Sequence, residues 1–323
     1  MTSASTYARL LSVGAYRPSR VLTNEAVAAN LKVNDIWLHR RTGICTRRVA
    51  SDEETLAYMG AQAANAATRR AGPGTDTVDC LIAASMTHQD PGASLARSIA
   101  DLLPKPPRAA LDVNAACAGF CVALELARCL IQGRTFNTVL VVGSERMRDI
   151  VADDDRATAP VFADGAGAVL LHAAPQTGIG APAWGSDPAH RRLITRPDPT
   201  RADGEPSMLQ MQGPQVYRWV IDHLPDVATT ALQRAGVDVC DIAAFIPHQS
   251  NDRIITALSV ALDLPSHVAV ARDITHSGNT AAASIPMAMD TLLHTRPDLS
   301  GKLALLLGYG AGMTFAAQVV QLP

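Results

Sequence analysis

A repeated pattern of strands and helices constrains the fold of this chain more than any other feature. Three strand-like apolar runs recur in the same order in each half: 79–89, 108–117 and 138–145, then 241–250, 267–279 and 303–310. Amphipathic helical stretches separate the runs, and that alternation is typical of an α/β fold. A repeat of this length indicates two copies of one α/β unit rather than a solenoid. We therefore predict two halves, residues 1–173 and 174–323, related by a pseudo-twofold axis.

The spacing between matching positions suggests a register for the repeat. The separation is 160, 162 and 165 residues for three pairs: His88 and His248, Cys117 and Asn279, Gly143 and Gly308. This register pairs Cys117 with Asn279, each at a junction between a strand and a helix. We expect the two junctions to lie close together at the pseudo-twofold axis, which favours a catalytic site there. Chance similarity between two βαβ stretches is the alternative.

Cys117 is the best candidate nucleophile among the six cysteines. It stands in DVNAACAGF, after a strand and at the first turn of a helix, where unpaired N–H groups and a partial positive charge favour a thiolate. The same N–H groups can contribute to an oxyanion hole. The alternative is a buried structural cysteine. We accept that alternative for the remaining five: Cys45, Cys80, Cys121, Cys129 and Cys240.

Composition and charge exclude several classes of protein. The net charge of −2 leaves no basic excess with which to bind nucleic acid. No run of about 18 apolar residues occurs, so we expect no membrane span, and the opening residues lack the apolar core of a signal peptide. Cysteines without C-x-x-C spacing indicate a reducing cytosol rather than a disulfide framework or a zinc site. We expect a cytoplasmic protein without a metal or a redox cofactor.

Four motifs, taken in order, resemble those of the ketoacyl-ACP synthase III family within the thiolase superfamily. They are DVNAACAGF, PHQSN (247–251), HSGNTAAASIP (276–286) and GYGAG (308–312). The opening VGAYRPSRVLTNE, WLHRRTGI (37–44) and FADGAGAVL (162–170) also match, so the similarity runs from about residue 10 to the C-terminus. The resemblance implies a thiolase fold, with the two halves forming a five-layered α-β-α-β-α arrangement, and a homodimer.

The resemblance also implies an acyltransferase that starts fatty-acid or polyketide chains. Acyl-CoA would acylate Cys117, and malonyl-ACP would then lose CO₂ and attack the acyl-enzyme. In the family, a His and an Asn at the positions of His248 and Asn279 donate hydrogen bonds to the malonyl thioester carbonyl. By the same resemblance, the N–H of Ala311 completes the oxyanion hole with that of Cys117; the family usually has glycine there, so the φ angle must suit alanine. Judged singly, a loop histidine and a helix-capping asparagine are the alternatives.

Several further residues match substrate contacts of the family. Trp37, Arg41 and Arg156 match positions that hold the adenine of coenzyme A, and stacking on an indole and a guanidinium suits a flat purine. A core aromatic is the alternative for Trp37. Arg218 and Arg253 match basic residues that meet the acidic acyl carrier protein.

Two departures from the family pattern concern substrates. Val260 and Ala261 stand where family members often carry lysines, and the loop 85–93 is about one residue short, with Asp90 near the place of an aromatic that shapes the acyl pocket. GYGAG lacks the second cysteine of a true thiolase, which disfavours that activity. Two other functions stay open: transfer of the acyl group from Cys117 to a non-malonyl acceptor such as an alcohol or amine, and a catalytically silent partner subunit.

Overall fold

The chain folds around two five-stranded sheets of the same topology. The computed structural model describes residues 6–72, 77–90, 92–196 and 208–323. The first sheet has the order β5-β4-β6-β7-β1, from strands β1 (Tyr7–Tyr16), β4 (Cys80–Ala84), β5 (Ala109–Val113), β6 (Thr138–Arg146) and β7 (Asp164–Ala174). The second has the order β12-β11-β13-β14-β8, from strands β8 (Ala183–Ser186), β11 (Ala244–Pro247), β12 (Ala269–Val270), β13 (Leu303–Gly310) and β14 (Thr314–Gln321).

The two sheets also agree in the direction of their strands. In each sheet the first three strands are parallel and the last two join antiparallel. The predicted α/β fold and its internal repeat are therefore confirmed. The predicted boundary between residues 173 and 174 falls at the end of β7, before the first strand of the second sheet.

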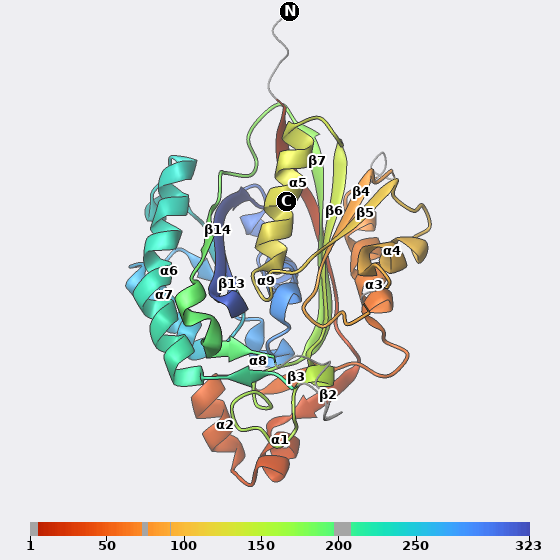
Figure 1. Cartoon of the computed structure of the whole chain (residues 1–323). Helices are drawn as coiled ribbons and strands as arrows, with labels where there is room; N and C mark the ends of the chain where they lie inside the picture. Colours follow the sequence, from red (N-terminus) through yellow and green to blue (C-terminus); the bar gives the residue numbers. More distant parts are fainter. Residues whose placement is uncertain (1–5, 73–76, 91, 197–207) are drawn as a thin grey trace, which may run out of the picture.

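Helices fill the space between the sheets and cover both outer faces, as Figure 1 shows. The central helices are α5 (Gly119–Gln132) and α9 (Ser284–Thr295). The outer face of the first sheet carries α3 (Leu56–Arg70) and α4 (Leu95–Asp101), and that of the second carries α6 (Gly213–Ala235) and α7 (Asp252–Ala261). The result is the expected five-layered α-β-α-β-α arrangement.

The burial of β4 explains why its sequence reads as a continuous apolar run. Cys80, Ile82 and Ala84 belong to the core around the central helices. Leu81 and Ala83 point the other way, into the core beneath α3 and α4. Successive side chains of a strand face opposite sides of a sheet, so a strand buried on both sides needs apolar residues at every position.

The structure sets the register of the repeat at 165 residues. The central helices begin at Gly119 and Ser284, which are 165 positions apart. Three residues before each of these, Ala116 and Ala281 have left-handed φ angles of 48° and 45°. Alanine rarely adopts that conformation, so its occurrence at matching positions shows that the two junctions share one backbone geometry.

This register corrects the pairing that we predicted for the nucleophile. Asn114 and Asn279 each accept a hydrogen bond from the backbone N–H two residues later, at 3.2 and 2.9 Å. The counterpart of Asn279 is thus Asn114, and the counterpart of Cys117 is Ala282. The predicted pairing of Cys117 with Asn279 is wrong by three residues, because runs of small residues at both junctions give sequence matching several possible alignments.

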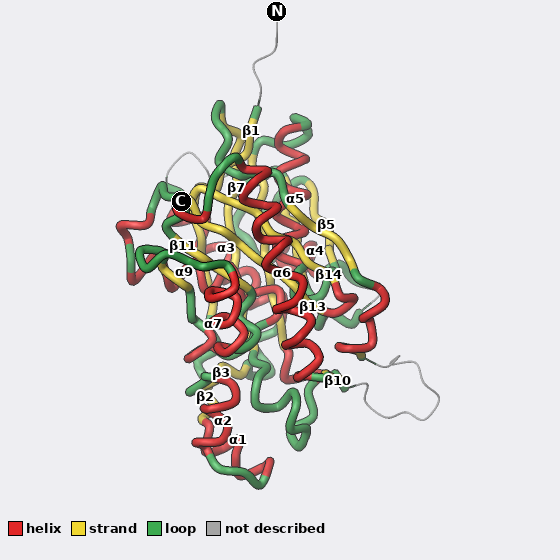
Figure 2. Tube along the Cα trace, turned by 90° about the vertical axis from the view of Figure 1, so that its left-hand side faces the viewer, coloured by secondary structure: helices red, strands yellow, loops and turns green. Residues whose placement is uncertain are grey.

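A small subdomain lies at one end of the molecule, beyond both sheets (Figures 1 and 2). It consists of β2 (Arg20–Thr23), α1 (Asn24–Leu31), α2 (Asp35–Thr42) and β3 (Thr46–Val49). Asn251, which caps α7, donates a side-chain hydrogen bond of 3.2 Å to the carbonyl of Arg41 at the end of α2. The subdomain is thereby joined to the second half near the cavity described next. Among the described residues, no helix is long and apolar enough to cross a membrane.

Candidate active site

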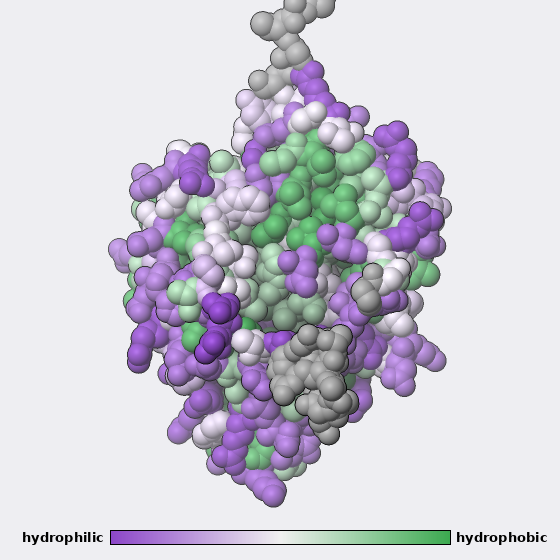
Figure 3. All heavy atoms as spheres, in the orientation of Figure 1, coloured by the Kyte–Doolittle hydropathy of each residue, from purple (hydrophilic) through white to green (hydrophobic). Residues whose placement is uncertain are grey.

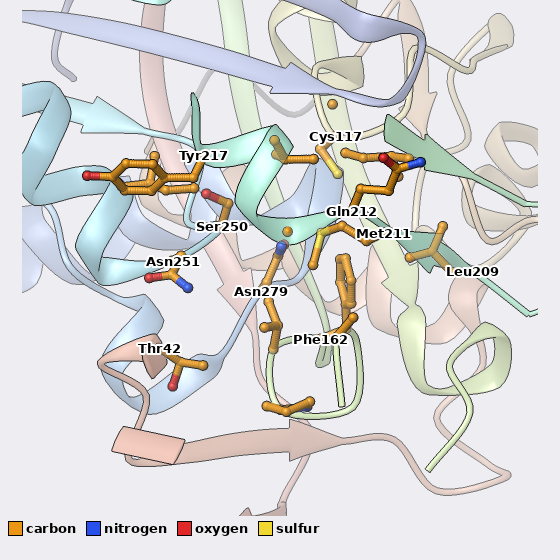
Figure 4. A pocket seen from close by; sticks show the side chains of 18 of the residues that line it. Thr42, Cys117, Phe162, Leu209, Met211, Gln212, Tyr217, Ser250, Asn251 and Asn279 are labelled. Atoms are coloured by element: carbon orange, nitrogen blue, oxygen red, sulfur yellow. The ribbon is translucent and has the colours of Figure 1, made fainter. Parts of the chain in front are cut away.

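One cavity brings together the three residues singled out in the sequence. It has a volume of about 540 Å³, and its lining includes Cys117, His248 and Asn279 (Figure 4). Cys117 belongs to the first half, whereas His248 and Asn279 belong to the second. The site therefore lies between the two copies of the repeat, at the ends of the central helices.

Cys117 lies just before the helix rather than inside it. It follows Ala116 with its left-handed φ and precedes Ala118, the N-cap of α5. Its side chain is buried, and its sulfur lies 3.9 Å from the sulfur of Met86. Burial and the charge of Glu145 raise the pKa of Cys117 above its ordinary value, and the backbone N–H opposes that rise. The effect predicted for the helix start, which favours a thiolate, acts in the opposite direction to this rise and stays a prediction.

His248 stands at the carboxyl end of β11 (Ala244–Pro247) with its orientation held on two sides. Its Nδ1 lies 2.7 Å from the hydroxyl of Ser284, which also accepts the backbone N–H of Gln249 at 3.3 Å. Its ring meets that of Tyr309 edge-on, with centroids 5.1 Å apart. Burial lowers the pKa of His248 to about 3, so the ring is neutral at pH 7. When Ser284 donates to Nδ1, the ring proton is on Nε2, where it can serve a ligand.

Sequence reasoning missed the contribution of Ser284. It lies in the quoted motif HSGNTAAASIP, as the first residue of α9, and its hydroxyl is the contact of His248 just described. The available signal was a hydroxyl at the end of a run of three alanines, one of three hydroxyl side chains in the motif. Its partner could not be inferred, because the two residues are 36 positions apart and meet only through the packing of α9 on β11.

Asn279 is held by its backbone and by its side-chain oxygen. Its N–H donates to the carbonyl of Val161 and its carbonyl accepts from Ala163, both at 2.9 Å. Its Oδ1 accepts the N–H of Ala281 at 2.9 Å, so the two N–H bonds of its amide are left to donate into the cavity. In Figure 4 the amide nitrogen points toward the part of the pocket that contains Cys117. Asn279 does not cap α9, which begins only at residue 284.

The glycine-rich turn after β13 (Leu303–Gly310) closes tightly over the nucleophile. A Cβ on Gly310 would lie 2.7 Å from the backbone nitrogen of Cys117, so only glycine leaves the N–H of Cys117 uncovered. The next residue, Ala311, also lines the cavity. It is not among the residues with positive φ, and Gly312 takes that conformation instead, with φ 124°. The φ angle at position 311 therefore suits alanine, as required. The role of the Ala311 N–H in an oxyanion hole stays a prediction.

Apolar side chains from scattered segments form the inner walls of the cavity. They are Met86, Phe162, Ile194, Leu209 and Met211. Sequence analysis did not identify them, because they lie on separate loops and short strands and share no periodicity. An apolar passage with polar groups at its end suits a ligand that has a long flexible arm and one reactive group.

Of the residues predicted to bind coenzyme A and a carrier protein, three exposed arginines line the cavity: Arg41, Arg156 and Arg253. Trp37 is half-buried on α2 and does not line it, but the guanidinium of Arg41 stacks 5.2 Å from the centre of its ring. Arg218 is exposed on α6, outside the cavity lining. Three of the five residues thus line the cavity and Trp37 contacts one of them, whereas Arg218 lies outside; the roles of all five stay predictions.

The two departures from the family pattern also have defined positions. Val260, near the end of α7, is 75% exposed, and Ala261 beside it is exposed too. An apolar surface therefore replaces the basic one that lysines would form. In the loop 85–93, Asp90 accepts the N–H of Gly92 at 2.8 Å, and residue 91 lies outside the described residues.

The other cysteines and His88 have no part in the cavity lining. All six cysteines are free thiols, and no cluster of three metal-ligating side chains occurs in the ranges that the structure describes. The ring of His88 contacts the carbonyl of Ala93 at 2.6 Å.

Comparison with known proteins gives consistent matches over the whole chain. Residues 111–188 match the family described as 3-oxoacyl-[acyl-carrier-protein (ACP)] synthase III, and residues 232–322 match the C-terminal part of that family. The chain is 42% identical to a beta-ketoacyl-[acyl-carrier-protein] synthase III of Streptomyces glaucescens, over 98% of this chain and 97% of that one. It is 40% identical to the mycobacterial beta-ketoacyl-[acyl-carrier-protein] synthase III of Mycobacterium avium (strain 104), over 100% and 98% of the two chains.

Solved structures agree with these relatives. The priming beta-ketosynthase from the R1128 polyketide biosynthetic pathway superimposes with a TM-score of 0.95 at 35% identity, covering 100% of this chain and 98% of the other. The 3-oxoacyl-(acyl carrier protein) synthase III of Pseudomonas aeruginosa PAO1 gives a TM-score of 0.91 at 32% identity, covering 98% of each chain.

Proposed function

The chain belongs to the 3-oxoacyl-[acyl-carrier-protein] synthase III family of condensing enzymes, and from this membership we propose a two-step reaction at Cys117. In the first step, the sulfur of Cys117 attacks an acyl-CoA, and its proton leaves with the CoA thiol. In the second, malonyl-ACP loses CO₂, and the resulting enolate attacks the acyl-enzyme and displaces the sulfur as a thiolate, which takes a proton from water to restore the thiol. The observation that carries this proposal is that one cavity holds a nucleophile and two neutral hydrogen-bond donors from the opposite half.

The donors suit the charge that develops in the second step. Loss of CO₂ places negative charge on the thioester oxygen of the malonyl group. The amide N–H bonds of Asn279 and the Nε2–H of His248 can donate to that oxygen without giving up a proton, because His248 is neutral. Donors fixed in advance of the reaction stabilise such charge, and each is worth about 3–4 kcal/mol in the transition state.

The first step needs a different pair of donors. We propose that the backbone N–H groups of Cys117 and Ala311 bind the thioester oxygen while the sulfur attacks. Gly310 supports this assignment, since its missing side chain leaves open the space in front of the Cys117 N–H. The raised pKa of Cys117 implies that the resting sulfur is protonated, so the thiol proton leaves during the attack.

Substrates would enter at the end of the cavity that contains the arginines. We propose that Trp37, Arg41 and Arg156 contact the nucleotide end of acyl-CoA, and that Arg218 and Arg253 contact the acyl carrier protein. Arg41, stacked on Trp37, and Arg156 both line this opening, which supports the first assignment. The exposed, uncharged end of α7 predicts weaker electrostatic attraction to an acidic carrier than a lysine-bearing surface would give.

We also propose that the chain acts as a homodimer in the cytoplasm. β5 is the edge strand of the first sheet, and its residues Ala109, Leu111 and Val113 are only partly buried. Val122 and Leu126 of the neighbouring α5 are partly buried too, and Figure 3 shows an apolar area over α5 and the strands beside it. An apolar face next to an open sheet edge suits pairing with a second copy. The six free thiols support a reducing compartment.

The test of the proposal is covalent labelling of Cys117. Incubation with radiolabelled acetyl-CoA should leave label on the wild-type protein and none on Cys117→Ala. Addition of malonyl-ACP should then remove the label as β-ketoacyl product with release of CO₂. Cys45→Ala, which alters an exposed cysteine away from the cavity, is the matched control and should label like the wild type. Wild-type protein that never acquires label would refute the proposal.

A second candidate function is favoured by the uncharged end of α7. It retains the acyl-enzyme but passes the acyl group to an alcohol, an amine or another non-malonyl acceptor. The two functions differ in whether carbon dioxide is formed. Label that leaves the protein only with such acceptors, and no CO₂ from malonyl thioesters, would establish the second and exclude the first.

A further inference from the structure

Glu145 is a fully buried carboxyl group next to the site, and the reaction proposed above does not use it. It lies near the end of β6 (Thr138–Arg146) with no exposed surface. In the described part of the chain no cation pairs with it. Five hydrogen-bond donors surround its two oxygens: the hydroxyls of Ser85 and Thr87, and the backbone N–H groups of Met86, Thr87 and Ala282. Every partner donates and none accepts, which suits the ionised form.

Glu145 occupies a position in the first half that is equivalent to a glycine of the active site in the second half. In the register of 165 residues, Glu145 is the counterpart of Gly310, and Ala282 is the counterpart of Cys117. The N–H of Ala282 donates to Glu145 at 3.3 Å. At the active site the matching N–H of Cys117 faces Gly310, which has no side chain. A carboxylate therefore fills, in one copy of the unit, the space that the other copy leaves open for a substrate oxygen.

The five donors belong to two segments that flank the nucleophile. Ser85, Met86 and Thr87 form the loop after β4 (Cys80–Ala84), and the sulfur of Met86 lies 3.9 Å from that of Cys117. Ala282 belongs to the turn that follows Asn279, whose Oδ1 holds the same turn from its other end. The carboxylate thus joins the apolar wall beside the sulfur to the turn that carries the amide.

We propose that Glu145 is a positioning residue that holds Met86 against the sulfur of Cys117 and fixes the turn that aims Asn279. Glu145 itself contacts no substrate. The proposal rests on the proposed function for the identity of the two steps, acylation and condensation. The two carboxylate oxygens of Glu145 accept from different segments. Oε2 accepts from Thr87 at 2.6 Å and from Ser85 at 3.0 Å, whereas only Oε1 accepts from Ala282.

The charge of Glu145 gives the proposal a second readout. Burial raises the pKa of Glu145 to about 7, against the opposing effect of its donors, and its negative charge raises the pKa of Cys117. The other nearby charged or titratable groups are engaged elsewhere: Arg146 pairs with Asp149, and the ring of His88 contacts a backbone carbonyl. Removal of the charge on Glu145 should therefore lower the pKa of Cys117.

Glu145→Gln separates the two tasks, because glutamine has the same shape but only one acceptor oxygen. Placed toward Ser85 and Thr87, that oxygen keeps their hydrogen bonds and the 3.2 Å bond from the N–H of Met86. The amide nitrogen then takes the place of Oε1, which leaves the N–H of Ala282 without an acceptor and removes the second, 3.1 Å contact of the Met86 N–H. We expect acylation of Cys117 by acetyl-CoA to stay within about threefold of wild type. We expect condensation with malonyl-ACP to fall about 10–100-fold, the effect of a donor displaced by about 1 Å. Alkylation of Cys117 by iodoacetamide should shift to lower pH.

Thr87→Val gives the converse change. It removes the hydroxyl that donates at 2.6 Å and leaves the bond from Ala282 in place. The loop that carries Met86 is then held less firmly, while the turn at Asn279 is unchanged. We expect Thr87→Val to accept longer acyl-CoAs at Cys117, seen as added mass on the intact protein, and to condense malonyl-ACP at close to the wild-type rate.

Glu125→Gln is the matched control for loss of a buried carboxylate. Glu125 lies inside α5, pairs with Arg128 and accepts from Gln318, away from the cavity lining. Glu125→Gln should lower the melting temperature without altering the ratio of the acylation rate to the condensation rate, or the pH profile of Cys117 alkylation. The proposal is overturned if Glu145→Gln slows both steps equally, or leaves condensation and the alkylation profile of Cys117 unchanged. If the wild type is never acylated, the proposed function fails, and the alkylation profile still decides whether Glu145 acts on Cys117.

Discussion

Replacing Gly310 by alanine tests how closely the glycine turn approaches the nucleophile. The added methyl carbon would lie 2.7 Å from the backbone nitrogen and 2.9 Å from the Cβ of Cys117. Both distances are below normal contact, and neither atom can move without moving the nucleophile. The φ of Gly310 is −174°, which alanine adopts readily, so the effect is a steric one and not backbone strain.

The expected cost has two parts. Overpacking of this kind destabilises a protein by about 1–3 kcal/mol. The methyl group also covers the N–H of Cys117, and loss of one oxyanion donor slows acyl transfer by about 10²–10³-fold. Urea unfolding measures the first part, and the rate of mass gain on Cys117 with acetyl-CoA measures the second, on protein that is still folded.

Gly308→Ala is the control, because its methyl group meets a different partner. That carbon would lie 2.9 Å from the sulfur of Cys121 and 3.4 Å from the Cα of Ala118. It should cost similar stability while leaving the N–H of Cys117 uncovered, so its acylation rate should stay within about tenfold of wild type. Equal acylation rates for Gly310→Ala and the wild type would refute our reasoning about the oxyanion donor.

Two further predictions concern His248. Ser284→Ala removes the hydroxyl that holds Nδ1, so the ring can carry its proton on either nitrogen; condensation should slow by about tenfold, and acylation by acetyl-CoA should change little. The pKa of His248 is lowered to about 3 by burial, against an ordinary value near 6.5 in the unfolded chain. The unfolded chain therefore binds one more proton between these values, so stability is fully present above about pH 6.5 and is lost as the pH falls toward 3. His248→Asn should remove this part of the pH dependence, as measured by urea unfolding at pH 4.5 and pH 7.5, and an unchanged dependence would contradict it.

The architecture was predictable because its cause is local and repeated. Strands such as β4 and β13, buried on both faces, must be apolar at every position, and the helices between them carry a single buried stripe. Cys117 and His248 could be picked out because each follows a strand within a recognisable motif. Asn279 was found from its motif alone: the strand expected over 267–279 is wrong beyond β12 (Ala269–Val270), and Asn279 follows the short helix α8 (Ile274–Ser277). The register of the repeat could not be predicted in the same way, because alanines and glycines at both junctions align equally well at several offsets.

Properties that depend on surroundings needed the tertiary structure. The sequence places Cys117 near a helix start and so predicts a thiolate, but the folded chain removes water from the sulfur and sets Glu145 nearby, and both raise its pKa. The sequence did not reveal the roles of Ser284 and Glu145, because their hydrogen-bond partners are far away along the chain. His248 is 36 positions from Ser284, whereas Ser85 and Ala282 are 60 and 137 positions from Glu145.

Sequence by itself thus determined the fold class, the two copies and the three polar groups of the site. The tertiary structure decided which residues correspond, the directions in which burial shifts the pKa values of Cys117 and His248, and the carboxylate that joins the two sides of the nucleophile. The physical reason is the sequence separation between interacting residues. Periodicity and motifs record what a residue needs from its own strand or helix, whereas desolvation and hydrogen bonding depend on neighbours that only packing brings together.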